Sequence, residues 1–216
     1  MSNNFVVFEG VDASGKSTAL EMMKSYCKSH SIEAEFFSDP GSTELGEKIR
    51  SIAKFGLEKE ELSPAAELLL FSAARAQLVD LKIIPALEAG KTIFCDRFIL
   101  STLVYQGYAK RSRYADSVHG LSDAFFHLKP SLNLIFDISY ETYLSRKGKR
   151  DEAEQNEKAD RFEDSADPTY IQRVIEGYRF ISRTISTYGK CRLIDANRSK
   201  DEVFADVLSA VQEIDD

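Results

Sequence analysis

The chain has 216 residues, of which 43% are hydrophobic, and its formal net charge is −7. This length suits one compact domain with a full core, so the sequence predicts a single domain over residues 1–216. A chain without an excess of Lys and Arg is a poor general binder of nucleic acid or of an anionic membrane, and neither partner is expected.

Three cysteines, Cys27, Cys95 and Cys191, are odd in number and far apart. We expect buried thiols at these positions, and not a disulfide framework or a metal site. The first residues are polar, the apolar run after them is too short for a signal peptide, and no window approaches the length of a membrane span. These features predict a cytoplasmic protein.

Short apolar runs alternate with long amphipathic segments along the chain. The predicted strands span residues 5–9, 33–38, 92–96, 132–138 and 191–195. The predicted helices span residues 16–30, 43–54, 63–89, 98–107, 114–127, 140–147, 168–188 and 199–214. This repeated alternation predicts an α/β fold with a five-stranded parallel sheet flanked by helices on both faces.

A glycine-rich loop follows the first predicted strand and opens a helix. Residues 10–17, GVDASGKS, fit the P-loop pattern G-x-x-x-x-G-K-[ST]. The glycines let successive backbone N–H groups face one phosphate, and the helix N-terminus adds its positive end. Lys16 is expected to reach the β- and γ-phosphates, and Ser17 to ligate Mg²⁺. The other expected ATP-binding residues here are Gly10, Val11, Asp12, Ala13, Ser14, Gly15 and Thr18.

A P-loop indicates a nucleoside triphosphate but does not specify the reaction. A switch GTPase also carries an Asn-Lys-x-Asp motif, which this sequence lacks. A large ATPase motor is longer and usually oligomerises around arginine fingers. The small size of the chain and one long polar segment favour phosphoryl transfer between two small molecules. A glycine turn with an exposed lysine is the alternative.

The helix predicted within 63–89 includes ELLLFSAARAQL, residues 67–78. Phe71 and Arg75 are four residues apart and therefore share a face of this helix. An aromatic plane beside a guanidinium can stack on a base and bond its edge. The alternative is that Phe71 is an ordinary core residue.

A second motif, DRFILSTLVYQG, covers residues 96–107 and begins where a predicted strand ends. Ligands of α/β sheets bind at the carboxyl ends of the strands. Asp96 can hold Mg²⁺ through water there, and Arg97 can clamp a phosphate. A capping aspartate beside a surface arginine is the alternative.

Residues 146–167, RKGKRDEAEQNEKADRFEDSAD, are nearly all charged or polar. Such a segment cannot bury itself, so it is predicted to be a mobile lid or a solvated excursion. Phosphoryl transfer needs positive charge around the moving group, and the P-loop supplies only Lys16. The candidate lid cations are Arg146, Lys147, Lys149, Arg150 and Arg161; a solvated basic face is the alternative.

These motifs together resemble the thymidylate kinase family. The matching stretches are FEGVDASGKST, DPGSTELGEKIR, ELLLFSAARAQL, DRFILSTLVYQG, DRFE followed by VIEGY, and IDANRSKDEV, which occur in the family's order and cover nearly the whole chain. The resemblance implies a P-loop fold of the nucleoside monophosphate kinase type with a polar lid. It also implies transfer of the γ-phosphoryl of ATP to dTMP with Mg²⁺, for dTTP synthesis, and a homodimer.

Two alternatives to this activity remain at this point. One is a kinase of the same fold that acts on another deoxynucleoside monophosphate, such as dUMP. The other is a catalytically inactive regulatory module that binds ATP.

The resemblance implies roles for individual residues on the acceptor side. It implies that Phe71 stacks on thymine and that Arg75 bonds the base edge. It implies further that Asp12 bonds the 3′-hydroxyl and that Arg97 holds the acceptor phosphate. The remaining implied acceptor residues are Ser101 and Gln106, which line the base pocket, and Tyr105, which packs against the sugar. Glu9 is expected in the polar shell on this side, or as a structural residue.

On the donor side, the resemblance implies that Asp195 and Ala196 lie beside adenine. Arg146, near the end of the predicted helix 140–147, is placed to cover ATP. Some family members carry a catalytic arginine inside the P-loop, where this chain has Ala13, and others supply it from the lid. Arg161 in DRFE matches that lid pattern best, so the expected catalytic residues are Asp12, Lys16, Arg97 and Arg161. The substrate loop departs from the family's Arg-Glu-Pro-Gly-Gly, since residues 38–42 are SDPGS.

Overall fold

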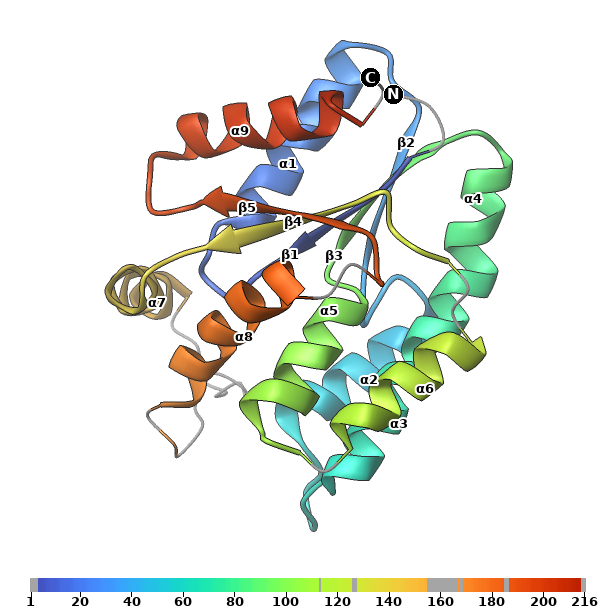
Figure 1. Ribbon diagram of the computed structural model, residues 1–216, viewed down its shortest axis with the longest axis vertical. Coiled ribbons are helices and arrows are strands. Elements are labelled where there is room, and N and C mark those ends of the chain that lie inside the picture. The colour runs from blue at the N-terminus through green and yellow to red at the C-terminus, as the bar shows by residue number, and fades with distance from the viewer. Residues whose placement is uncertain are drawn as a thin grey trace.

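A computed structural model describes residues 4–112, 114–125, 128–154, 167, 169–184 and 187–214 (Figure 1). The strands are β1 (Phe5–Glu9), β2 (Ala34–Ser38), β3 (Thr92–Asp96), β4 (Leu132–Asp137) and β5 (Lys190–Asp195). The α-helices are α1 (Lys16–Ser29), α2 (Glu44–Phe55), α3 (Pro64–Leu78), α4 (Ile84–Glu88), α5 (Ile99–Thr102), α6 (Ala115–Phe125), α7 (Tyr140–Glu154), α8 (Tyr170–Thr184) and α9 (Lys200–Gln212). Two π-helical segments, η1 (Val79–Ile83) and η2 (Leu103–Ala109), complete the described elements.

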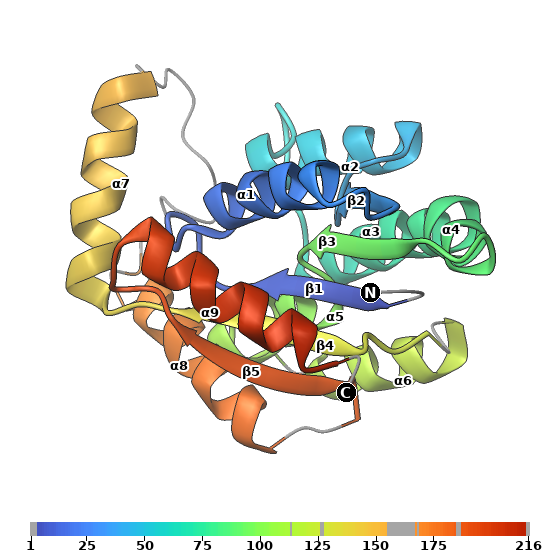
Figure 2. The ribbon, with the colours of Figure 1, turned by 90° about the horizontal axis from the view of Figure 1, so that it is seen from above.

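The five strands form one parallel sheet in the order β2-β3-β1-β4-β5. Helices α1 and α9 pack together over one face, and α4 and α8 contact strands from the other (Figure 2). Central strand β1 is buried along its whole length, which explains its uninterrupted apolar run. The predicted fold class is therefore confirmed.

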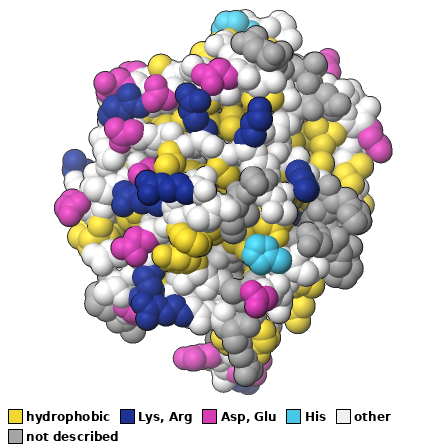
Figure 3. Space-filling view, in the orientation of Figure 1, with side chains coloured by type: hydrophobic (Ala, Val, Ile, Leu, Met, Phe, Trp, Pro, Cys, Tyr) yellow, Lys and Arg dark blue, Asp and Glu magenta, His cyan; other side chains and the backbone are white. Residues whose placement is uncertain are grey.

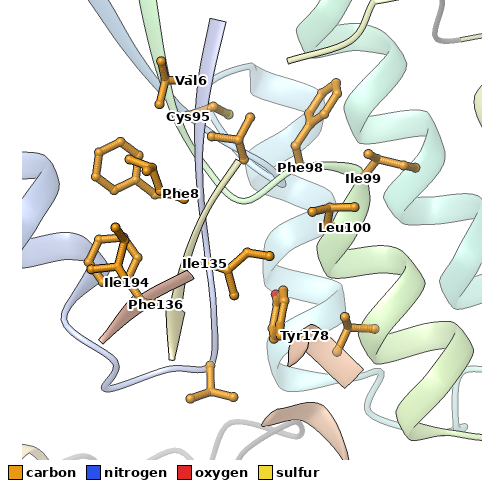
Figure 4. Close-up of a cluster of buried hydrophobic side chains, with 14 of the residues drawn as sticks. Val6, Phe8, Cys95, Phe98, Ile99, Leu100, Ile135, Phe136, Tyr178 and Ile194 are labelled. Carbon is orange, nitrogen blue, oxygen red and sulfur yellow. The ribbon is translucent and has the colours of Figure 1, made fainter. Parts of the chain in front are cut away.

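The core lies on both faces of β1. The Phe8 ring stacks on the Phe136 ring, with 5.6 Å between the ring centroids. Phe98 and Leu100 lie on the opposite side of β1 in Figure 4, together with Tyr178 of α8. The side chains of β1 are therefore packed into the core on both faces of the sheet.

Three predictions about elements and cysteines need correction. The helix predicted over 63–89 is divided into α3, η1 and α4, because Pro85 has no N–H to donate and the Ile84 N–H bonds the Val79 carbonyl in π-helical fashion. The helix predicted to end at residue 147 continues to Glu154, so the polar segment begins as a helix. Cys191 is only half-buried, because edge strand β5 is largely exposed.

None of the helices within the described ranges is both long and apolar enough to cross a membrane. On the face shown in Figure 3, Lys and Arg side chains are interspersed with Asp and Glu side chains. This face therefore carries charges of both signs, although the net charge of the chain is negative.

Candidate active site

The predicted site residues gather at the carboxyl edge of the sheet. The P-loop follows β1, Arg97 follows β3 and Ala196 follows β5. Helix α7 lies beyond this same edge in Figures 1 and 2. Because parallel strands all end at one edge, segments far apart in the sequence meet there.

The P-loop needs its glycines for two geometric reasons. Gly10 has a φ of +142°, and a Cβ there would lie 2.8 Å from the carbonyl oxygen of Phe136. Gly15 has a φ of +98° directly before α1. Only glycine adopts these backbone angles without strain, so the loop can curl tightly around an anion.

Lys16 is buried and turns back into this loop. Its Nζ donates hydrogen bonds to the carbonyl oxygens of Gly10 and Val11, at 2.9 and 2.8 Å. Burial, together with the neighbouring positive charge of Arg97, lowers the pKa of Lys16 to about 8. The ammonium group is therefore held where the loop backbone curls, at the start of α1.

Arg146 of α7 connects the expected donor-side segments. Its Nη1 donates to the carbonyl oxygen of Ser14 at 3.2 Å, and its Nη2 donates to that of Ala196 at 2.8 Å. Asp195, Ser17 and Thr18 are exposed at the same edge. The structure thus brings together the P-loop, the loop after β5 and the base of the predicted lid.

Ser17 and Asp96 fit a magnesium ion by their chemistry. Asp96 ends β3, and its Oδ1 is buried without a hydrogen bond from any described residue. A carboxylate and a hydroxyl are oxygen donors of the kind that Mg²⁺ binds. The two predicted metal residues therefore suit this cation.

Asp12, at the tip of the P-loop, forms an ion pair with Arg97. The Arg97 Nη2 lies 2.7 Å from Asp12 Oδ1, and its Cζ lies 5.1 Å from the ring centroid of Tyr105. Arg97 adopts a left-handed backbone with a φ of +66°, which is unusual for a residue with a long side chain. Burial alone would raise the pKa of Asp12, but the charges of Arg97 and Lys16 outweigh it and hold that pKa well below its usual range.

Glu9 is fully buried and accepts several hydrogen bonds near the Asp12–Arg97 ion pair. It accepts hydrogen bonds from the backbone N–H groups of Phe98 and Ser101, at 2.9 and 3.2 Å. It also accepts from the hydroxyls of Ser101 and Tyr178, at 2.5 and 3.0 Å. Burial raises the pKa of Glu9. The Ser101 hydroxyl is therefore engaged with Glu9, although the side chain still lines the cleft described next.

One cleft next to the P-loop is lined by every residue predicted for the acceptor. These are Asp12, Phe71, Arg75, Arg97, Ser101, Tyr105 and Gln106. They come from the P-loop, α3, the turn after β3, α5 and η2. Residues that were predicted from three separate motifs therefore line the same cleft.

Arg75 is held more tightly than the sequence suggests. It is buried, its Nε lies 2.5 Å from Asp39 Oδ2, and its Nη2 donates to Thr102 Oγ1 at 2.7 Å. Asp39 belongs to the SDPGS loop that departs from the family pattern, and its backbone N–H bonds the Asp96 carbonyl. Burial raises the pKa of Asp39, while the charge of Arg75 opposes this.

Sequence reasoning missed several residues that line the cleft or support it. Arg50, Lys54 and Thr102 line it together with Asp39. Tyr178 donates to Glu9 from α8. Arg50 and Tyr178 lie within the family-like stretches DPGSTELGEKIR and VIEGY, so those stretches carried a usable signal.

The candidate lid cations have different positions. Arg146 contacts the P-loop, whereas Arg150 lines the acceptor cleft and its charge helps to lower the pKa of Asp12. Arg161 lies outside the described residues. Among the lid cations that the structure describes, Arg150 is therefore the one beside both Asp12 and Arg97.

A family model described as thymidylate kinase matches residues 8–207 of the chain. The thymidylate kinase of Pelotomaculum thermopropionicum is 38% identical over 214 residues, which cover 99% of this chain and 95% of that protein. The thymidylate kinase of Symbiobacterium thermophilum is 36% identical over 210 residues, which cover 97% of this chain and 93% of that protein. The thymidylate kinase of Alkalilimnicola ehrlichii is also 36% identical, with coverages of 97% and 90%.

Proposed function

We infer the activity of this chain from the premise that it belongs to the thymidylate kinase family. It is an ATP-dependent nucleoside monophosphate kinase that transfers the γ-phosphoryl group of ATP to dTMP and yields dTDP and ADP. The observation that carries this inference is the cleft beside the P-loop, in which all of the predicted acceptor residues meet.

For the donor site, we propose that ATP lies along the P-loop and α1. Lys16 and the backbone N–H groups of the loop bind the phosphates, while Asp195 and Ala196 lie beside adenine. Arg146 covers the nucleotide from α7, consistent with its bonds to Ser14 and Ala196. Ser17 and Asp96 would hold Mg²⁺, which supplies positive charge to the β- and γ-phosphates when bound.

For the acceptor site, Phe71 stacks on thymine, and Tyr105 packs against the sugar and disfavours a 2′-hydroxyl. Asp12 accepts a hydrogen bond from the 3′-hydroxyl, and Arg97 donates to the acceptor phosphate. The ion pair between Asp12 and Arg97 fixes both groups at the loop tip, where donor and acceptor must meet in line.

The transferred group needs positive charge in the transition state. Arg150 lies at the cleft beside Asp12, so it is placed to supply that charge from α7. Arg161, expected in this role from its motif, remains a second candidate from the same lid at 146–167. Closure of the lid would also exclude water and limit hydrolysis of ATP.

The test is a coupled assay of ADP release with ATP and Mg²⁺ against dTMP, dUMP, dCMP, dGMP and UMP in parallel. A strong preference for dTMP is expected. A preference for dUMP or another monophosphate would keep the P-loop site and reassign the base pocket. Tight ATP binding without turnover on any acceptor would instead identify a regulatory module.

We further propose a homodimer that works in the cytoplasm. The α3–η1 segment carries Leu69 and Leu81, whose side chains are more than half exposed. A contiguous exposed apolar patch marks a protein interface, and we propose that these two side chains belong to one.

A further inference from the structure

Gln106 lines the acceptor cleft, but one end of its amide is already engaged. The Gln106 Nε2 donates to Glu67 Oε1 at 2.9 Å. Both side chains are buried, and Glu67 is only 1% exposed. Gln106 belongs to η2, and Glu67 lies in the first turn of α3. The orientation of the amide therefore depends on a residue outside the predicted site.

Glu67 also forms an ion pair with a lysine. Lys110 Nζ lies 2.5 Å from the same oxygen, Oε1, that accepts from Gln106. An ionised carboxylate accepts hydrogen bonds and cannot donate, so Gln106 must turn its NH₂ group toward Glu67.

The other end of the amide is then fixed by elimination. The Gln106 oxygen receives no hydrogen bond from any residue that the structure describes. The side chain lines the cleft together with Phe71 and Arg75. Glu67, Phe71 and Arg75 follow one another at intervals of four residues, so they share one face of α3.

We propose that Glu67, together with Lys110, is a positioning residue that selects a 4-oxo pyrimidine over a 4-amino pyrimidine. It does so by keeping the Gln106 oxygen directed at the base. This inference rests on the proposed function, since it requires a pyrimidine monophosphate in the cleft. It goes beyond that function because it assigns the specificity to a residue that does not touch the base.

The chemistry follows from the donors and acceptors of the two bases. A 4-oxo pyrimidine presents an N3–H donor, which the Gln106 oxygen accepts, and an O4 acceptor, which suits the donor-only guanidinium of Arg75. A 4-amino pyrimidine presents an unprotonated N3 opposite that oxygen and an amino group opposite the guanidinium. Both contacts then become repulsive, which discriminates more strongly than a merely missing bond.

The sharpest test compares dTMP with 5-methyl-dCMP, because these acceptors share the 5-methyl group and differ only at N3 and C4. Glu67→Gln replaces the carboxylate by an amide of the same shape that both donates and accepts. Gln106 then loses its fixed orientation. The ratio of kcat/KM for dTMP to that for 5-methyl-dCMP should fall by roughly three- to tenfold. The matched control Glu88→Gln, at an exposed position on α4, should leave the ratio unchanged.

A double variant separates positioning from general destabilisation. Gln106→Met should lower the same ratio, and Glu67→Gln added to it should lower the ratio no further, because Glu67 acts through Gln106. An unchanged ratio in Glu67→Gln, with a lower melting temperature, would make Glu67 a structural residue only. If Glu67→Gln does not fold, a full wild-type ratio in Gln106→Met overturns the proposal by itself.

The wild-type protein distinguishes this proposal from the proposed function. A wild type that does not phosphorylate dTMP refutes the function and this inference with it. A wild type that prefers dTMP over 5-methyl-dCMP, with a ratio insensitive to Glu67→Gln and Gln106→Met, refutes the inference alone.

Discussion

At the scale of single residues, Lys16 has a charge that depends on pH in the working range. Its pKa of about 8 lies below the ordinary value for lysine because of burial and the charge of Arg97. Phosphate oxygens favour the charged form, so ATP raises this pKa on binding. ATP binding should therefore weaken as the pH rises through about 8. Above that pH, the protein should take up a proton when ATP binds.

Isothermal titration calorimetry checks this prediction. ATP affinity is measured from pH 6.5 to 9.5, and proton uptake is obtained at pH 8.5 from buffers with different heats of ionisation. Binding of dTMP to the same protein serves as the control and should show no such step. An ATP affinity that is constant across this range would contradict the pKa shift of Lys16.

The second prediction at the scale of single residues concerns Arg150. Arg150→Ala should lower kcat by roughly a hundred- to a thousandfold while the Kd for dTMP changes little, since a transition-state contact forms late. Arg161→Ala is measured beside it, because both belong to the proposed lid. The control is Arg183→Ala, which removes an exposed arginine from α8.

Steady-state kinetics and dTMP binding together decide the role of Arg150. Equal losses in kcat and in dTMP affinity would remove it from the transition state and make it a ground-state binding residue. A large loss in kcat for Arg161→Ala alone would return the role to the residue that the motif indicated.

At the scale of elements, α3 contributes side chains both to the hydrophobic core and to the acceptor cleft. Phe71 is buried, which suits either a core side chain or a base platform. Phe71→Ala should weaken dTMP binding by roughly ten- to a hundredfold, as the loss of a stacked base contact does. A typical core Phe→Ala substitution lowers the free energy of unfolding by several kcal/mol. If Phe71 is a base platform, Phe71→Ala should lower the melting temperature by much less than such a loss would.

Differential scanning fluorimetry and dTMP titration of the same sample test this prediction. Phe180→Ala on α8 is the control, since it removes an aromatic ring that is half exposed. A protein that unfolds without binding any nucleotide would show that Phe71 is a core residue.

The elements were largely predictable from the sequence, and the contacts between them were not. Apolar runs and the P-loop pattern are local, so strands and helices were found to within a few residues, apart from the division at Pro85 and the extension of α7. By contrast, Arg75 pairs with Asp39 across 36 residues, and Tyr178 bonds Glu9 across 169. No periodicity connects such positions.

The site shows the same division between local pattern and tertiary partner. Motif matches named the acceptor residues of the cleft, because those residues lie within contiguous family-like stretches, but they missed Arg50, Lys54 and Thr102. The residues that orient them also lie within such stretches, as Glu67 does for Gln106 and Glu9 for Ser101, but the pairing joins two different stretches that no local pattern connects. Burial of a charged side chain depends on the whole fold, so its partner becomes visible only in three dimensions.

At the scale of the whole molecule, the exposed leucines of the α3–η1 segment lead to a prediction about the oligomeric state. If Leu69 lies in the interface of a homodimer, Leu69→Glu buries an uncompensated charge there and should weaken dimerisation by roughly a hundredfold or more. Sedimentation equilibrium over a range of protein concentrations measures this change. Leu144→Glu on α7, where the leucine is also half exposed, is the matched control.

A dimer that is unaffected by Leu69→Glu would place the interface on another surface. A wild-type chain that sediments as a monomer at every concentration would remove the assembly itself. The ADP-release assay run on the same samples then shows whether turnover depends on assembly.

Strand β1 has a consequence for the two nucleotides together. Glu9 organises the acceptor side, and Gly10, the next residue, begins the loop for the donor phosphates. Consecutive Cα atoms are separated by about 3.8 Å. Because these two residues are adjacent at the end of a buried central strand, the sheet holds the donor loop and the acceptor side in a fixed relation to each other. In the proposed mechanism, this shared strand keeps the two substrate sites aligned whether or not the proposed lid is closed.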